Sequence, residues 1–241
     1  MEVERVIIIG HRGSMADRPE NTMVSFERAV AAGAGGIECD VHLSSDNVPV
    51  VIHDPDTIRT TGISSTVEKT PARDLSSMDA GSYFSSIYEG EPVPLLEETA
   101  AWAAERNVTL HVELKEQLYH KDEETVAQIL ETLSPLNEKN IVISTFCHRY
   151  IPLIKKKNPA IEAALLTKSP FRRGPAYANL IQADSIHIRH TPQAAWYYSR
   201  WAGTGMSIRV YNVRNLVQLK RLSSAGVSGV IVDNPALMMR L

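Results

Sequence analysis

The stretch Val6-Ile7-Ile8-Ile9-Gly10-His11-Arg12-Gly13 decides how the rest of the chain is interpreted. Four β-branched residues in succession are typical of a strand buried on both faces, and the run ends abruptly at Gly10. His11 and Arg12 therefore stand where a buried strand reaches solvent, which is where α/β enzymes hold their catalytic groups. The glycines on either side permit unusual φ angles and a close approach of the backbone to a ligand, and Arg12 offers a planar fork suited to a phosphate or carboxylate.

The length and composition are those of one globular domain, which we expect to span residues 1–241. Apolar residues make up 44% of the chain and charged residues 22%, and the net charge of -3 argues against a nucleic-acid partner. No apolar run approaches the roughly 20 residues of a membrane span.

The first strand is expected within six residues of the start, which leaves no room for a signal peptide, so we expect a cytosolic protein. Cys39 and Cys147 lack the partner spacing of a metal site and are predicted to be reduced thiols. The oligomeric state does not follow from the sequence.

Eight units, each a predicted strand followed by a predicted helix, can be identified along the chain, and the first begins at the opening stretch. The predicted strands are 6–9, 36–41, 109–115, 141–144, 161–166, 185–188, 207–210 and 229–232. The predicted helices are 22–33, capped by Asn21 or Thr22, then 94–106, 122–133, 149–157, a weak helix near 176, 192–201, 213–225 and 235–241. Eight such units in about 250 residues indicate a (β/α)8 TIM barrel. The alternative, a doubly wound open sheet, lacks its phosphate-binding glycine fingerprint after the first strand.

A short apolar run, residues 48–54, ends in a second histidine, His53, beside a carboxylate. From about 55 to 91 the periodicity is lost, and a structureless loop of that length is improbable inside a compact domain. We therefore predict a small folded insertion after the second strand, over the mouth of the site. Its aromatic residues either cap the leaving group of a substrate or form the insertion's own core; they are Tyr83, Phe84 and Tyr88.

Acidic residues gather at the ends of two predicted strands. Side chains alternate along a strand, so Glu38 and Asp40 share one face and repel each other unless a cation lies between them. Closing the barrel brings all strand ends to one rim, where the converging residues are His11, Arg12, Glu38, Asp40, His53, Glu113 and Lys115. Three carboxylates without a cysteine favour Mg²⁺ or Ca²⁺ over zinc.

The remaining groups at this rim suit a phosphodiester. His11 and His53 can serve as general acid and general base, while Arg12 and Lys115 can hold an anionic group. A phosphodiester needs its charge neutralised, a nucleophile deprotonated and a leaving alkoxide protonated. The other histidines are expected to have structural roles. His111 is predicted to lie in the core, and structural positions are predicted for His42, His187 and His190, the last two being next in line for a catalytic role.

Six short motifs span almost the whole chain: His11-Arg12-Gly13, Pro19-Glu20-Asn21-Thr22, Ile37-Glu38-Cys39-Asp40-Val41, Pro49-Val50-Val51-Ile52-His53-Asp54, Val112-Glu113-Leu114-Lys115 and the closing stretch from Gly226 to Pro235. In these motifs and in their order, the chain resembles the glycerophosphodiester phosphodiesterase family. The resemblance implies that Glu38, Asp40 and Glu113 hold a divalent metal. It further implies that His11 and His53 act as acid and base, and that Arg12 and Lys115 contact the phosphate.

What the resemblance implies for activity is hydrolysis of a glycerophosphodiester to sn-glycerol 3-phosphate and an alcohol, with attack by the neighbouring glycerol hydroxyl as a plausible first step. The chain departs from the family's pattern at Tyr211, at Val213-Arg214-Asn215, at Ser228 and at Asn234, which puts the fit to the glycerol moiety in question. Two alternatives stay open. One is a lysophospholipase D-type or cyclising enzyme acting on lysophospholipids, and the other is a non-catalytic barrel that binds a phosphorylated ligand.

Overall fold

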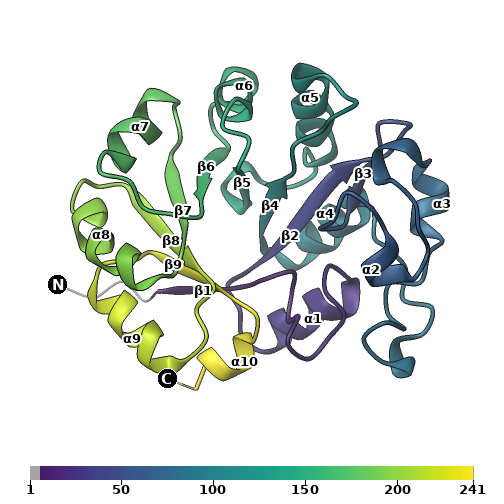
Figure 1. Cartoon of the computed structure of the whole chain (residues 1–241), viewed down its shortest axis with the longest axis horizontal. Coiled ribbons are helices and arrows are strands. Elements are labelled where there is room, and N and C mark those ends of the chain that lie inside the picture. Colours follow the sequence, from purple (N-terminus) through teal and green to yellow (C-terminus); the bar gives the residue numbers. More distant parts are fainter. Residues whose placement is uncertain (1–5, 241) are drawn as a thin grey trace.

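The computed structural model describes residues 6–240, and these form a closed barrel of parallel strands surrounded by helices (Figure 1). Each strand is hydrogen-bonded to the next around the ring, and the pairing of the first strand with the second closes it. The eight barrel strands are β1 (Ile7–Gly10), β2 (Gly36–Leu43), β4 (Thr109–Leu114), β5 (Ile141–Thr145), β6 (Glu162–Thr167), β7 (Ser185–Arg189), β8 (Ser207–Tyr211) and β9 (Gly229–Val232). The predicted (β/α)8 barrel is thereby confirmed.

Helices cover the outside of this ring and return the chain to the start of each following strand. They are α1 (Met23–Ala31), α4 (Leu96–Arg106), α5 (Asp122–Thr132), α6 (Tyr150–Lys157), α7 (Gly174–Leu180), α8 (Pro192–Ala202), α9 (Leu216–Ser224) and α10 (Pro235–Met238), with a 3-10 turn, η3 (Glu138–Asn140), before β5. Parallel strands that are buried on both faces consist of continuous apolar runs, and in β1 this burial holds for Ile8, Ile9 and Gly10, whereas Ile7 is exposed. None of these helices, within residues 6–240, is long and apolar enough to cross a membrane.

The run before the insertion adds one strand that the sequence did not predict. β3 (Pro49–Val51) pairs antiparallel with the far end of β2, so that residues 36–51 form a hairpin whose second arm lies outside the ring. This hairpin extends β2 beyond the predicted end at residue 41 and returns the chain to the rim, where His53 follows directly.

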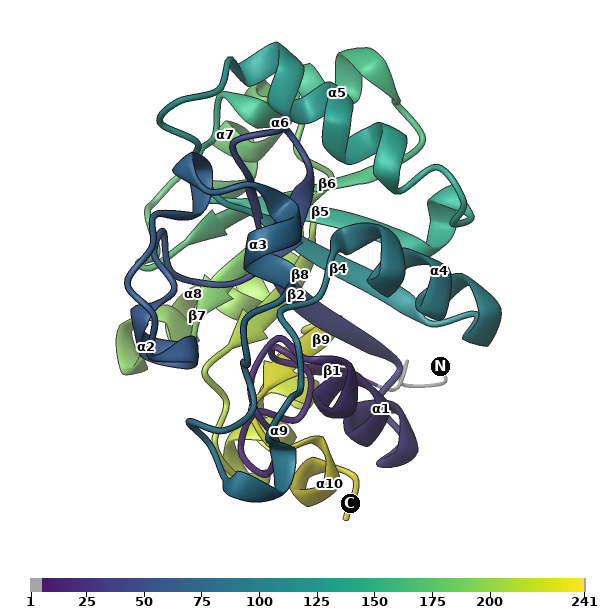
Figure 2. The same cartoon turned by 90° about the vertical axis from the view of Figure 1, so that its right-hand side faces the viewer.

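The insertion folds around a core of its own. It contains α2 (Ile58–Thr61), η1 (Val67–Lys69), α3 (Ala72–Ser76) and η2 (Ser86–Tyr88), and Figure 2 shows α2 and α3 from the side on which they lie. Buried residues from β3 and the insertion form a cluster separate from the main core; its members are Val50, Ile52, Val67, Ala72, Leu75, Met78, Ala80 and Val93. The main core fills the layer between strands and helices and includes both cysteines, which are buried and unpaired as predicted.

Element boundaries differ from the predicted ones by a few residues where local caps decide. The ninth helix starts at Leu216 instead of Val213, because the Asn215 side chain accepts a hydrogen bond from the Gln218 backbone N–H and fixes the helix start there. The last helix ends at Met238, and residue 241 lies outside the described residues. Thr22 is the N-cap residue of α1, but its hydroxyl donates to the Pro19 carbonyl and caps nothing.

Candidate active site

A pocket of about 640 Å³ opens at the carboxyl ends of the barrel strands. Its lining contains nearly all of the predicted site residues, together with apolar side chains on the side of β5 and β6. The predicted residues that line it are His11, Arg12, Glu38, His53, Glu113 and Lys115, while Asp40 lies just beneath, at 1% exposure. The pocket therefore brings together residues that are more than a hundred positions apart in the sequence.

Strand register places the three carboxylates against one another. β2 and β4 are neighbours, and their register pairs Asp40 with Glu113, while Glu38 lies two residues earlier on the same face of β2. One carboxylate oxygen of each residue lies within 4.8 Å of the others. Glu38 and Asp40 are buried, so their charges cannot be screened by water. This cluster has the oxygen donors that a hard divalent cation prefers.

Two cations already neutralise part of this charge. The Lys115 ammonium lies 2.7 Å from Asp40 Oδ1 and also contacts Glu113. The Arg12 guanidinium lies 3.0 Å from the other oxygen of Asp40, Oδ2, which also accepts a hydrogen bond from the Asn21 amide at 2.8 Å. Both oxygens of Asp40 therefore have partners, and a metal ion bound here would share Asp40 with Lys115 or take its place.

The two carboxylates of β2 differ sharply in acidity. Burial, together with the charges of Asp40 and Glu113, raises the pKa of Glu38 to about 7. Burial would also raise the pKa of Asp40, but the charges of Lys115 and Arg12 outweigh it and hold that pKa well below its usual range. The cluster thus retains an excess of negative charge at Glu38 that a proton or a bound cation relieves. The residues present fit a divalent metal ion on this ground.

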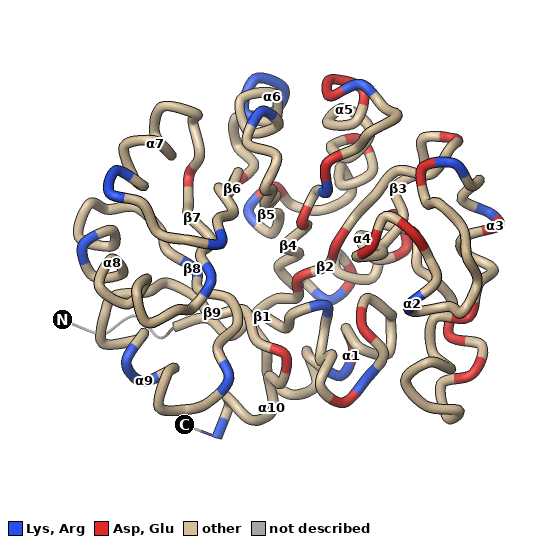
Figure 3. The backbone as a smooth tube through the Cα atoms, viewed as in Figure 1, with Lys and Arg blue, Asp and Glu red and all other residues tan. Residues whose placement is uncertain are grey.

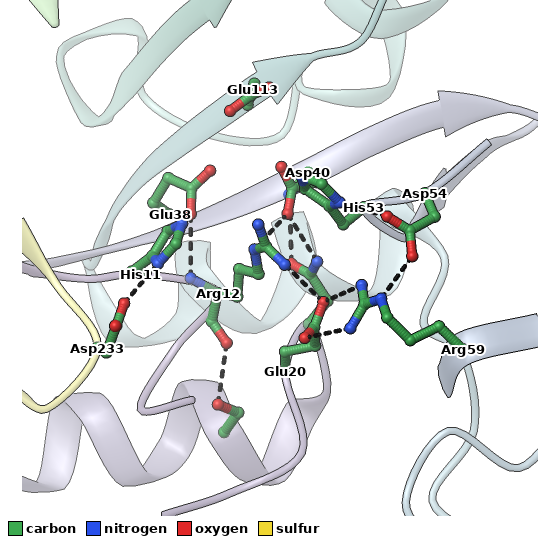
Figure 4. A network of polar contacts seen from close by, with 12 residues as sticks. His11, Arg12, Glu20, Glu38, Asp40, His53, Asp54, Arg59, Glu113 and Asp233 are labelled. Atoms are coloured by element: carbon green, nitrogen blue, oxygen red, sulfur yellow. Dashed lines mark hydrogen bonds and ion pairs between the residues drawn. The ribbon is translucent and has the colours of Figure 1, made fainter. Parts of the chain in front are cut away.

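His11 is held by a carboxylate at the opposite end of the chain. Its Nδ1 lies 2.6 Å from Asp233 Oδ1, which follows β9 and lies beside β1 in the barrel (Figure 4). Burial would lower the pKa of His11, but the hydrogen bond to Asp233 and the charge of Glu38 outweigh it and raise that pKa. Because an ionised carboxylate only accepts hydrogen bonds, Nδ1 donates to Asp233 and Nε2 is left for the pocket.

His53 has an equivalent arrangement on the other side of the acidic cluster. Its Nδ1 lies 2.7 Å from Asp54 Oδ1, and the second oxygen of Asp54 accepts a hydrogen bond from Arg59 of α2. Arg59 in turn donates to both oxygens of Glu20, which also pairs with Arg12 at 2.7 Å. Figure 4 shows this chain of contacts running from His53 to Arg12, so the insertion, through Arg59, fixes two site residues at once.

The loop that carries Arg12 has an unusual backbone. Arg12 and Asn21 both adopt left-handed conformations, with φ of 49° and 56°, and each is held by contacts to β2. Gly13 has φ of 84°, and a Cβ there would lie 2.4 Å from the Ser25 hydroxyl. The glycines next to His11 and Arg12 were expected to let the backbone approach a ligand. The unusual φ is observed at Gly13, where the close packing is against α1, and the approach to a ligand stays a prediction.

The other histidines occupy three different settings. His42 lies beneath the rim, where its Nε2 donates to the His53 carbonyl at 3.2 Å and so helps to position that residue. His111 is buried in the barrel beside His187, as predicted, and His187 reaches the pocket floor, where Arg209 Nη1 donates to its Nε2. His190 lines a neighbouring cavity and does not line this pocket.

The insertion aromatics do not line the pocket. Phe84 contacts Tyr83 and Tyr88 edge to face, and the Tyr83 hydroxyl accepts a hydrogen bond from the Glu20 backbone N–H. Of the insertion, Pro55 alone is among the lining residues of the described chain. The expectation that these aromatics meet the alcohol part of a substrate is therefore not supported, and Phe146, Leu166 and Tyr211 lie in the pocket wall instead.

Four polar residues of this site were not assigned a role from the sequence, namely Glu20, Asp54, Arg59 and Asp233. Asp54 was visible as the carboxylate beside His53, and Asp233 stands at the end of the last barrel strand, a position that meets the first strand once the barrel closes. Arg59 carried no signal, since its contact depends on the fold of the insertion.

The eight-stranded parallel barrel, with an acidic cluster between two carboxylate-paired histidines at its carboxyl end, is the arrangement of a TIM-barrel enzyme. Comparison with known proteins identifies the family. The model of the glycerophosphoryl diester phosphodiesterase family matches residues 11–237. The chain belongs to this family.

Relatives and solved structures agree with this assignment. A Bacillus subtilis protein called only "uncharacterized protein YqiK" is 34% identical over 233 residues, which cover 95% of each chain. A glycerophosphodiester phosphodiesterase of Bacillus altitudinis is 32% identical and covers 95% of this chain and 94% of its own. The chain is also similar to an Oleispira antarctica phosphodiesterase solved with the product sn-glycerol-3-phosphate, with a TM-score of 0.90, 26% identity and coverage of 97% and 95% of the two chains.

Proposed function

We propose that this enzyme of the glycerophosphodiester phosphodiesterase type hydrolyses glycerophosphodiesters to sn-glycerol 3-phosphate and an alcohol. The observation that carries the proposal is that two histidines, each with its Nδ1 bound to a carboxylate, open into one pocket from either side of the acidic cluster. The family match and the product bound in the Oleispira antarctica structure support the choice of substrate. Nothing in the comparisons favours the lysophospholipid alternative.

In the proposed reaction, His11 and His53 divide the two proton transfers. One imidazole takes the proton from the neighbouring glycerol hydroxyl, whose oxygen forms a new bond to phosphorus, and the other gives a proton to the alkoxide that leaves. Water then opens the cyclic phosphate, with the proton transfers reversed. The Nδ1 contacts to Asp233 and Asp54 keep both Nε2 atoms directed at the substrate.

Glu38, Asp40 and Glu113 would hold a divalent cation, Mg²⁺ or Ca²⁺, which supplies Lewis-acid neutralisation of the phosphate charge. Arg12 and Lys115 contact the phosphate in this proposal. Lys115 now pairs with Asp40 and Glu113, and neutralisation of those carboxylates would release its ammonium group for the phosphate. Glu38→Gln should weaken Mg²⁺ or Ca²⁺ binding, measured by titration calorimetry, at least about tenfold, while the circular dichroism spectrum stays that of the wild type.

The test of the proposed function is to follow purified protein with glycerophosphocholine, glycerophosphoethanolamine and glycerophosphoglycerol by phosphorus NMR. We expect sn-glycerol 3-phosphate as the phosphorus-containing product of all three. Release of choline phosphate from glycerophosphocholine would show cleavage of the other P–O bond and would refute the assignment. Lys220→Gln is a suitable control variant, because this exposed residue of α9 lines neither the pocket nor its neighbouring cavity.

A further inference from the structure

A second cavity of about 640 Å³ adjoins the active-site pocket between α8 and α9. We call it the basic groove and define it by Arg189, His190, Asn212, Arg214 and Arg221 among its lining residues. Arg189 ends β7, Asn212 follows β8, and the other two arginines come from the segment before α9 and from its last turn. Arg189 and Asn212 also line the active-site pocket, so the two cavities share a wall.

The arginines of the basic groove have no acidic partner in the described part of the chain. None of the three forms an ion pair within residues 6–240, and no Asp or Glu is among the groove's lining residues there. Other arginines behave differently, as Arg59 does with Glu20 and Arg149 with Glu116 and Asp122. Guanidinium groups that converge on a cavity without a carboxylate are a suitable setting for an anion from outside the chain.

The charge of this part of the chain is strongly one-sided. Residues 163–232 contain nine Lys and Arg and a single acidic residue, Asp184, although the whole chain has a net charge of -3. Asp184 is itself paired with Lys155, and neither residue lines the basic groove. Figure 3 shows the same separation, with little red over α7, α8 and α9 and abundant red over α1 to α5. The positive potential on this side therefore extends from the groove to the pocket rim at Arg189 and Lys168.

Two residues of the groove, Arg189 and Asn212, also line the active-site pocket, and its arginines act electrostatically on groups there. Arg214 is close enough to the carboxylate that holds His11 for its charge to help lower the pKa of Asp233, after the hydrogen bond from His11. Arg189 likewise acts on Tyr211 in the pocket wall. Because Arg189 and Asn212 line both cavities, a diester that extends past them from the acidic cluster would reach Arg214 and Arg221.

We propose that the basic groove binds a second anionic group, carried by the leaving alcohol of the substrate. The inference rests on the proposed function and narrows it to a substrate class, namely glycerophosphodiesters whose alcohol bears a phosphate or a carboxylate. The glycerol phosphate half remains at the acidic cluster, while the anionic end of the alcohol meets the planar forks of the groove. A choline or ethanolamine group would meet like charge there, which disfavours those diesters.

The test compares two diesters that differ by one phosphate, namely glycerophosphoglycerol and the same molecule phosphorylated on the leaving glycerol. We expect kcat/KM of the wild type to be about tenfold or more higher for the phosphorylated diester, and Arg214→Gln/Arg221→Gln to remove that preference. Lys220→Gln, which removes one positive charge beside Arg221 at an exposed position outside the groove, should retain it. A wild type without preference, or an equal loss in the Lys220 variant, would overturn the proposal.

Binding separates this inference from the proposed function. The affinities of both diesters for His53→Ala protein, measured by calorimetry, need no turnover, so the phosphorylated diester should bind more tightly even if the reaction is a different one. Absence of turnover on every diester would refute the proposed function. The comparison of the two affinities would still test whether the groove binds the second anionic group. Equal affinities of the two diesters would refute the groove as an anion subsite whatever the turnover.

Discussion

At the scale of single residues, the site depends on which nitrogen of each histidine is occupied. His11 and His53 both use Nδ1 for a carboxylate, and a carboxylate contact of this kind fixes the tautomer and the orientation of the ring. The histidines were predictable from the sequence, because each follows a buried strand. Asp233 was not, since its contact with His11 joins residues 222 positions apart and arises only when the barrel closes.

Removing either imidazole should abolish one proton transfer. Because general acid or base catalysis by one side chain is typically worth about 10² to 10⁴ in rate, His11→Ala and His53→Ala should each lower kcat by that order. KM should change less, since the phosphate contacts remain. If His53→Ala keeps a near-normal kcat in a steady-state assay, the role belongs to another group, and His187 on the pocket floor becomes the next candidate.

Removing the carboxylates that orient the histidines should lower kcat by a smaller factor, and only while the histidine itself is present. Asp233→Asn and Asp54→Asn should each lower kcat about ten- to a hundredfold, the usual size for a residue that orients a site group. Asp74→Asn, at an exposed position of α3, is the matched control. The decisive comparison is a double-mutant cycle, in which Asp233→Asn should cost little once His11 is alanine. Additive losses would show that Asp233 acts independently of His11.

At the scale of elements, the face on which a strand residue lies could be predicted, and hairpin geometry could not. Alternation along β2 placed Glu38 and Asp40 on one face, and the parallel neighbour β4 supplied Glu113 as expected. β3 is only three residues long and pairs antiparallel with β2, so its own periodicity carries no information about direction. The packing of the insertion against Glu20 and Val24 likewise comes from side-chain contacts that no sequence pattern shows.

The position of the insertion aromatics leads to a prediction about selectivity. Phe84 contacts Tyr83 and Tyr88 and does not line the pocket, so Phe84→Ala should destabilise the insertion by about 1 to 3 kcal/mol, less than a fully buried phenylalanine costs. The ratio of kcat/KM between glycerophosphocholine and glycerophosphoethanolamine should stay within about twofold. A large shift in that ratio without a change in urea denaturation would contradict this prediction and would show that these aromatics contact the alcohol part of the substrate.

The barrel floor should make stability depend on pH. Burial, and then the charge of Arg209, hold the pKa of His187 well below its usual range, so below about pH 6.5 the unfolded chain binds a proton that the folded protein does not. The free energy of unfolding should therefore fall as pH is lowered from 7 to 5, by up to about 1.4 kcal/mol per pH unit for this histidine. In urea titrations, His187→Gln should show a shallower decline; an unchanged slope would contradict this account.

At the scale of the whole molecule, the fold was predictable because eight strand and helix units repeat along the chain, and the site was predictable because barrel closure brings all strand ends to one rim. The separation of charge between the two halves is also present in the sequence, but the cavity that concentrates three arginines depends on how α8 and α9 pack. The ion pairs of Lys115 with Asp40 and Glu113 likewise could not be predicted from the sequence, because alternation shows which residues share a face and not which atoms come into contact.

The measurement that tests the central claim most directly is turnover of glycerophosphoglycerol by protein from which metal has been removed with EDTA followed by dialysis. Glu38, Asp40 and Glu113 crowd more negative charge than Arg12 and Lys115 neutralise, and phosphodiester cleavage needs further positive charge at that point. The account predicts that metal-free protein releases no sn-glycerol 3-phosphate and that Mg²⁺ or Ca²⁺ restores its release. Full activity of the metal-free protein in excess EDTA would contradict it.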